Sequence, residues 1–257
     1  MENIERYKHL NKYLKEKFGE RTLKICIDGG FTCPNRNDSS GCIFCSERGS
    51  GDHIKVTSDI SAQVQTYFKS YKAERANKFI AYFQNFTNTY APVDVLKEKY
   101  DSALIDDRIV ALAVATRPDC INEDICKLLK SYTPKYHVWV ELGLQTSNNL
   151  TGNLINRGYT SEQFSQAVAL LNKYNIDVVT HIMVGLPGEN FDDFKNTVSF
   201  INTHHIQGLK IHCTYVVENT VLAHMLKNGE YESISLEYYL ESVAYVLTHI
   251  SPDIIIH

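Results

Sequence analysis

Apolar positions along the chain follow two alternating patterns. Six short stretches are rich in apolar and β-branched residues, which is typical of strands buried on one or both faces. Between them, apolar residues recur at helical spacing. Alternation of strands and helices repeated six times predicts an α/β fold with a parallel sheet and crossover helices. The predicted strands cover residues 23–28, 78–84, 109–115, 138–144, 176–185 and 209–216.

The remaining apolar spacing predicts the helices and a final strand. Residues 3–18 form an amphipathic N-terminal helix ended by Gly19. A second helix starts with a good cap at Thr57 or Ser58 and continues to about Lys72. Proline is favoured in the first helical turn, and Pro92 opens another helix. Further predicted elements are a helix after residue 119 to about 129, helices at 161–174 and 189–203, and a short C-terminal strand at 252–257.

Composition narrows the class of protein. The 257 residues contain 44% hydrophobic and 22% charged residues, ordinary values for a globular chain with a large core. No linker divides them, so we expect a single domain over residues 1–257. The net charge of −4 does not indicate the strongly basic surface that nucleic-acid-binding proteins usually carry. Seven cysteines without a signal peptide indicate reduced thiols and a cytoplasmic location, and no apolar run approaches the roughly 18 residues of a membrane span.

Polar residues and glycines collect where the predicted strands end. In parallel barrels the carboxyl ends of the strands carry the chemistry, so these residues are candidates for a site. They are Gly29, Gly30, Gln84, Asn85, Thr116, Arg117, Glu141 to Gln145, Gly185 to Glu189, and His212.

Three cysteines directly after the first strand provide the strongest chemical signal. Cys33, Cys42 and Cys45 follow a C-x8-C-x2-C spacing, with no fourth cysteine nearby in sequence. A structural zinc site uses four closed ligands, whereas a cubane iron–sulfur cluster takes one thiolate per iron. Three thiolates therefore leave one iron open to a small molecule. C-x-x-C alone also serves zinc sites and redox dithiols, so a zinc-binding, nucleic-acid-associated module with a histidine such as His53 stays open as an alternative.

The cysteine loop resembles the cluster loop of radical S-adenosylmethionine (radical SAM) enzymes. The long spacing between its first two cysteines resembles that of the YtqA/YhcC subgroup and of the related Elongator-type domains. Further stretches that resemble this subgroup are 23–36, 81–92, 116–119, 141–146, 155–158 and 181–189. The resemblance implies a partial (β/α)6 TIM-type barrel of parallel strands, with a [4Fe–4S] cluster and S-adenosylmethionine (SAM) at its rim. It also implies a C-terminal extension in relatives, which we expect to be absent after residue 257 here.

By this resemblance the three cysteines ligate the cluster, and their neighbours contact the cofactor. Phe44 stands where the family carries an aromatic residue near the adenine. Gln84 and Asn85 occupy the position that receives the methionine amino group; a solvated strand end is the alternative. Glu141 and Gln145 stand where the family contacts the ribose or the methionine carboxylate. An apolar strand gains nothing from burying a carboxylate unless it is paired, which favours a function for Glu141.

Two arginines and the last strand ends complete the expected site. Arg117 and Arg157 are candidates to bind the cofactor carboxylate, with a structural salt bridge as the alternative for either. The backbone of the 185–189 turn, with Gly185 and Pro187, is expected to meet the adenine, because glycine permits close approach. His212 is a further candidate from the sixth strand. Three residues are expected in packing roles instead: Cys26, Cys120 and Cys126.

The functional expectation follows from the resemblance. The chain is expected to cleave SAM reductively to a 5′-deoxyadenosyl radical and to act on a tRNA wobble uridine. A radical SAM enzyme for a small metabolite is the alternative within the family. The implied partners are SAM, an electron donor such as flavodoxin or ferredoxin, and tRNA, with no membrane.

Overall fold

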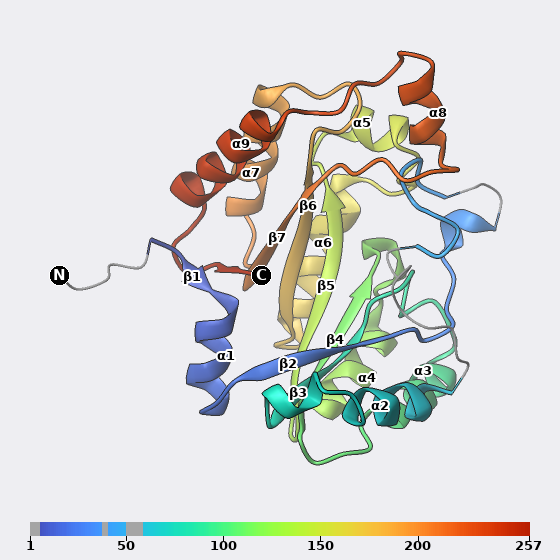
Figure 1. The fold of residues 1–257 in the computed structure, drawn as a ribbon, viewed down its shortest axis with the longest axis vertical. Coiled ribbons are helices and arrows are strands. Elements are labelled where there is room, and N and C mark those ends of the chain that lie inside the picture. Colours follow the sequence, from blue (N-terminus) through green and yellow to red (C-terminus); the bar gives the residue numbers. More distant parts are fainter. Residues whose placement is uncertain (1–5, 38–40, 50–58) are drawn as a thin grey trace.

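The computed structural model describes residues 6–37, 41–49 and 59–257. In this part of the chain, eight strands form one parallel sheet in the order β1-β8-β7-β6-β5-β4-β3-β2. The sheet curls into a half-barrel (Figure 1). The strands are β1 (Lys8–His9), β2 (Thr22–Ile27), β3 (Lys78–Phe83), β4 (Ile109–Thr116), β5 (His137–Gln145), β6 (Asp177–Val184), β7 (Gly208–Cys213) and β8 (Ile255–Ile256).

Helices connect successive strands, and most cover the convex face of the sheet (Figure 1). Side-chain caps fix several of their starts; the α6 and α7 helices begin with full capping boxes at Thr160 and Asn190. The helices are α1 (Leu10–Phe18), α2 (Ile60–Phe68), α3 (Val93–Ala103), α4 (Glu123–Tyr132), α5 (Asn149–Leu154), α6 (Ser161–Lys173), α7 (Phe191–Asn202), α8 (Val221–Lys227) and α9 (Leu236–His249).

Side chains along β5 point alternately to the outer core and to the concave face of the sheet. Val138, Val140 and Leu142 join the main core between the sheet and the outer helices. Trp139 belongs to a second cluster on the concave face, and Glu141 lines a cavity there. Because successive strand residues point to opposite faces, a strand that is apolar on one face can present chemistry on the other.

The concave face is closed at one end and open at the other. Leu14 of α1 packs against Ile80, Trp139 and Val179, which closes the amino-terminal end of the half-barrel. Ala111 and Ala113 of β4 join the same inner cluster. Small side chains on the middle strand leave room above this plug, at the carboxyl ends of the strands.

The expected parallel α/β half-barrel is confirmed, with local corrections. All six predicted strands are present, and the C-terminal strand is reduced to β8. The N-terminal helix predicted over 3–18 begins only at Leu10, because Lys8–His9 pair with β8 and the His9 side chain caps the helix; residues 3–5 lie outside the described residues. The α2 helix starts after Asp59, and its predicted start at Thr57 or Ser58 also lies outside them.

Three helices were not singled out from the sequence. The α5, α8 and α9 helices occupy stretches to which no element was assigned. The described part of the chain contains no helix both long and apolar enough to cross a bilayer.

Candidate functional site

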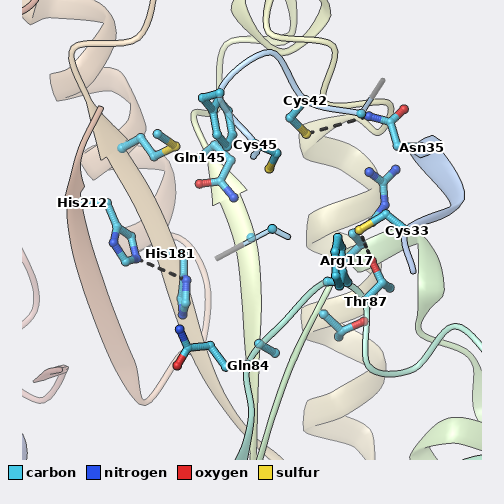
Figure 2. A pocket seen from close by; sticks show the side chains of 18 of the residues that line it. Cys33, Asn35, Cys42, Cys45, Gln84, Thr87, Arg117, Gln145, His181 and His212 are labelled. Carbon is cyan, nitrogen blue, oxygen red and sulfur yellow. Dashed lines mark hydrogen bonds between the residues drawn. The ribbon is translucent and has the colours of Figure 1, made fainter. Parts of the chain in front are cut away.

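A cavity of about 560 Å³ lies at the carboxyl ends of the strands. This volume is in the range of small-molecule sites. Figure 2 shows the three cysteines on one side of it and His181 and His212 on the other, with Gln145 between them. The cysteine loop supplies one wall, and strands β3 to β7 supply the opposite wall and the floor.

The three cysteines of the loop line this cavity together. Thr87 Oγ1 donates a hydrogen bond to Cys33 Sγ at 3.0 Å, and Asn35 Nδ2 lies 3.8 Å from Cys42 Sγ (Figure 2). A hydrogen bond from Cys45, aided by Arg117 and Asn35 against the effect of burial, lowers the pKa of Cys42 to about 7. The same Cys42–Cys45 hydrogen bond, with burial, raises the pKa of Cys45, and burial raises the pKa of Cys33. Among the three ligand candidates, thiolate character is therefore concentrated on Cys42.

The segment 155–158 anchors the cysteine loop. Ile43 N donates to Ile155 O at 3.1 Å, and Asn156 Nδ2 donates to Gly41 O at 2.8 Å. Asn35, which contacts Cys42, also donates to Asn156 O at 2.5 Å. These bonds from a neighbouring loop fix the position of a cysteine segment that contains only one short 3₁₀ turn among its described residues.

The two candidate arginines have different surroundings. Arg157 is fully buried and lies outside the cavity lining; its guanidinium donates to the carbonyls of Leu144, Thr146 and Tyr159 at 2.5–2.9 Å. Arg117 lines the cavity, pairs with Asp119 at 2.8 Å and donates to Arg157 O. The structure thus places a positive charge beside the cysteines through Arg117 and uses Arg157 to hold the end of β5.

Two glutamines project from strand ends into the cavity. Gln84 follows β3, and Gln145 ends β5 with a backbone φ of 65°. Left-handed backbone is uncommon outside glycine and marks a constrained position. Arg157 bonds the carbonyls on either side of Gln145, which holds this conformation. Asn85, by contrast, is buried outside the lining and donates to Asp28 Oδ2 at 3.0 Å.

A buried charged layer forms the floor of the cavity. Glu141, only 1% exposed, accepts from Lys24 at 3.2 Å, from His181 at 3.0 Å and from the Trp139 indole at 3.1 Å, and it also contacts Lys210. Burial alone would raise the pKa of Glu141, but Lys210, Lys24 and His181 hold it well below its usual range. The carboxylate is therefore ionised and fully paired within the protein.

Glu141 also determines how the two histidines share their protons. His181 Nε2 donates to the ionised carboxylate, so His181 Nδ1 is an acceptor, and it lies 3.3 Å from His212 Nε2. His212 Nε2 then donates, and its Nδ1 is left as an acceptor. Burial lowers the pKa of His181. His212 is exposed at the cavity, and its partial withdrawal from water, together with the adjacent His181 and Lys210, lowers its pKa, so both rings are neutral at pH 7.

The remaining predicted residues divide between the lining and its support. Phe44 lines the cavity, whereas Gly185 and Pro187 lie outside the lining. Gly185 has a φ of 81°, accepts from the Tyr231 hydroxyl and packs against Ile234. The cavity brings together Cys33, Cys42, Phe44, Cys45, Gln84, Arg117, Glu141, Gln145 and His212, and leaves Asn85, Arg157, Gly185 and Pro187 outside its lining.

Several residues of the site had no predicted role. Asn35 and Thr87 contact cysteine sulfurs, and Tyr82 and Lys210 line the floor. Lys210 could have been recognised from the sequence, because a charged residue within an apolar strand needs a buried partner. Tyr82 could also have been recognised, since it stands two residues before Gln84 and therefore lies on the same face of the strand.

The residues present fit an iron–sulfur cluster with a bound nucleoside. The donor set consists of three thiols from one loop, two of them in contact with hydrogen-bond donors, facing a cavity with aromatic and amide groups. Among the described residues, no group of three or more His, Cys, Asp or Glu side chains converges on a single metal ion. His53 of the zinc alternative lies outside those residues.

Comparison with known proteins agrees with this geometry. Residues 29–201 match the model of the radical SAM superfamily, and residues 206–257 match that of the radical SAM C-terminal domain. The uncharacterized protein YtqA of Bacillus subtilis is 39% identical, over 98% of this chain and 80% of its own length. A tRNA uridine(34) acetyltransferase of Methanocaldococcus jannaschii is 34% identical, over 54% of this chain and 26% of its own length.

Among solved structures, the Elp3 of Methanocaldococcus infernus has a TM-score of 0.70 at 20% identity. The alignment covers 92% of this chain and 56% of that one, so the present chain spans little more than half of that relative. The resemblance supports the half-barrel fold. The family match over residues 29–201 and the 39% identity to YtqA show that the chain belongs to the radical SAM superfamily, whose enzymes use a [4Fe–4S] cluster and SAM.

Proposed function

We propose that the cavity binds SAM against a cluster held by Cys33, Cys42 and Cys45, and that the enzyme abstracts hydrogen from the side chain of a tRNA wobble uridine. When bound, the cluster supplies the electron that cleaves SAM to a 5′-deoxyadenosyl radical, which is the cofactor's own chemistry. The observation that carries the proposal is the meeting of three cysteines from one loop with the carboxyl ends of five strands around one cavity.

The side chains around the cavity then have distinct tasks. Cys33, Cys42 and Cys45 would hold the cluster through three thiolates, which would leave a position on it for SAM. Arg117 places a cation beside the cysteines, where it attracts the carboxylate. Gln84 and Gln145 present amide donors and acceptors to the nucleoside, and Phe44 offers an aromatic face to the adenine.

Since His212 is neutral, it binds a substrate group through a hydrogen bond and not through an ion pair. Its Nδ1 is an acceptor because Glu141 orders the protons of His181 and His212. A substrate N–H or O–H is the group that such an acceptor binds. The α1 plug closes the amino-terminal end of the half-barrel, which limits the entry of water from that side.

The tRNA assignment is supported by the relatives named for tRNA uridine(34), although their alignment covers about half of this chain. A cytoplasmic location and an electron donor such as flavodoxin or ferredoxin belong to the same proposal. Mass-spectrometric nucleoside analysis of tRNA from a strain lacking the gene tests it. We expect one wobble-uridine derivative to change in abundance, and to be restored by the wild-type gene but not by a Cys42→Ala gene. Unchanged nucleosides would contradict the tRNA assignment.

A small-metabolite substrate is the second candidate. It is favoured by the net charge of −4, because tRNA-binding proteins generally carry a basic surface. Adding bulk tRNA from the deletion strain to the reduced enzyme distinguishes the two. On the tRNA assignment it stimulates formation of 5′-deoxyadenosine, and on the metabolite assignment only a low-molecular-weight extract does so.

A further inference from the structure

Two lysines at the floor of the cavity share a single carboxylate. Lys24 Nζ lies 3.2 Å from Glu141 Oε1, and Lys210 Nζ contacts Glu141 Oε2. Among the residues that the structure describes, Glu141 is the one carboxylate in ion-pair contact with either ammonium group. His181 and His212 are neutral, so they do not alter this balance. The layer therefore holds one more ammonium group than carboxylate groups, and burial together with the neighbouring Lys24 lowers the pKa of Lys210 accordingly.

The excess charge faces the cavity through Lys210. This side chain is 15% exposed and lines the cavity together with Tyr82 and His212. An ammonium group has three donors; here one is directed to Glu141 and one to the Tyr82 hydroxyl at 3.2 Å. The described residues give Lys210 no third acceptor, so one donor remains for a group that enters the cavity.

Physical chemistry defines what that group is. Two ammonium groups around one carboxylate repel each other, and both are largely withdrawn from water, so their charge is costly unless it is matched. A second anion beside Lys210 restores neutrality and takes the remaining donor. Charge-assisted hydrogen bonds of this kind are about twice as strong as neutral ones.

The position of Lys210 separates this site from the cysteines. Lys210 precedes His212 by two residues on β7 and points to the same face, so it lies roughly 6–7 Å further from the carboxyl end of the strand. An anion bound there lies at the floor of the cavity, whereas Cys33, Cys42 and Cys45 belong to the loop at the carboxyl ends of the strands. A molecule held at the floor extends toward that loop.

We propose that Lys210, with Tyr82 and His212, forms a subsite for an anionic group of the substrate, a carboxylate or a phosphate. The inference rests on the proposed function, in which SAM occupies the cysteine side. It adds that the substrate enters with its charged group first and presents its reacting carbon toward SAM.

The single tryptophan provides a direct readout of the subsite. Trp139 Nε1 donates to Glu141 Oε1 at 3.1 Å, so an anion bound beside Lys210 changes the charge around the Glu141 carboxylate and with it the indole environment. The fluorescence of the reconstituted full chain is titrated with sodium acetate, inorganic phosphate and, as a neutral probe, acetamide. We expect a saturable change with acetate or phosphate and none with acetamide. The anion that binds more tightly identifies the substrate group as a carboxylate or a phosphate.

Three variants assign the effect. Lys210→Met should weaken anion binding about ten- to hundredfold, the loss expected for one charged hydrogen bond. Lys210→Arg keeps the charge and should stay close to wild type. Lys127→Met changes the net charge equally on an exposed face of α4 and should leave binding unchanged.

Other outcomes overturn the subsite. These are no saturable response of wild type to either anion, equal binding by Lys210→Met and wild type, or equal losses in Lys210→Met and Lys210→Arg. A parallel loss of SAM affinity in Lys210→Met would assign the anion to SAM instead and overturn the subsite as well. Failure of wild type to form 5′-deoxyadenosine would contradict the proposed function alone, because the fluorescence titration does not depend on turnover.

Discussion

Glu141 illustrates how much of this site depends on a single side chain. Its carboxylate is fully buried and contacts two lysines, a histidine and an indole. That Glu141 contacts the ribose or the methionine carboxylate of the cofactor stays a prediction of the family resemblance. Its role in the structure is to pair with both Lys24 and Lys210, which it neutralises only in part, and to order the protons of His181.

Replacing Glu141 with glutamine should destabilise the fold by about 3–5 kcal/mol, because two buried ammonium groups lose their counter-ion. Urea unfolding at pH 7 measures the difference. The matched control is Glu98→Gln, which makes the same change at an exposed position of α3 and should shift stability by less than about 0.5 kcal/mol. A Glu141→Gln protein as stable as the control would show that the lysines are not charged in the native state.

His137 carries a pH dependence of stability. Burial, with a contribution from Lys17, lowers the pKa of His137 to about 4, and its side chain is only 14% exposed. Between pH 4 and 6.5 the unfolded chain binds a proton at this residue that the native state does not. Stability therefore rises with pH in this window, by up to about 1.4 kcal/mol per pH unit.

Comparison with His137→Asn isolates this residue from the other histidines. Between pH 6.5 and 5.5, wild type should lose about 1 kcal/mol more stability in urea unfolding than the variant does. Equal losses in the two proteins would mean that the ring is solvated and titrates normally in the native state.

At the scale of elements, segment 155–158 holds the cysteine loop in place. Gly158 has a φ of 78°, and a Cβ there would lie 2.7 Å from Asn35 Oδ1. Asn35 in turn contacts Cys42 Sγ. The I-N-R-G motif (155–158) therefore supports the cluster ligands, and its arginine is used to hold β5.

Gly158→Ala should displace Asn35 and reduce the iron retained after anaerobic reconstitution. Gly229→Ala is the matched control, because Gly229 has a φ of 74° and a Cβ there would meet nothing within 4 Å. Both variants should lose about 1–2 kcal/mol of stability from left-handed backbone strain. Only Gly158→Ala should lose iron. Equal iron in the two variants would show that the anchor does not support the ligands.

The local pattern of apolar residues predicted most helices and strands, but it did not predict the long-range contacts between them. The apolar run at 109–115 and the alternation at 138–144 predicted β4 and β5, because burial on a sheet leaves a direct periodic trace. The start of α1 at Leu10 depends on pairing between Lys8–His9 and a strand almost 250 residues away in sequence, so no local pattern shows it. Sequence periodicity likewise left α9 unassigned.

At the scale of the whole molecule, the half-barrel explains which site residues could be predicted. Strand ends converge in any parallel barrel, so Gln84, Gln145 and His212 could be expected near the cysteines. Whether a side chain at such an end faces the cavity or the core depends on one residue of register. Asn85 follows Gln84 directly and is buried beside Asp28 instead.

The central claim is that Cys33, Cys42 and Cys45 hold a cluster at which SAM is cleaved. The most direct test is to reconstitute the full chain anaerobically with iron and sulfide, reduce it in the presence of SAM, and quantify 5′-deoxyadenosine. Wild type should form it, and Cys42→Ala, prepared in the same way, should form none above background. Equal amounts from both proteins, or none from a wild type loaded with iron and sulfide, would contradict the account.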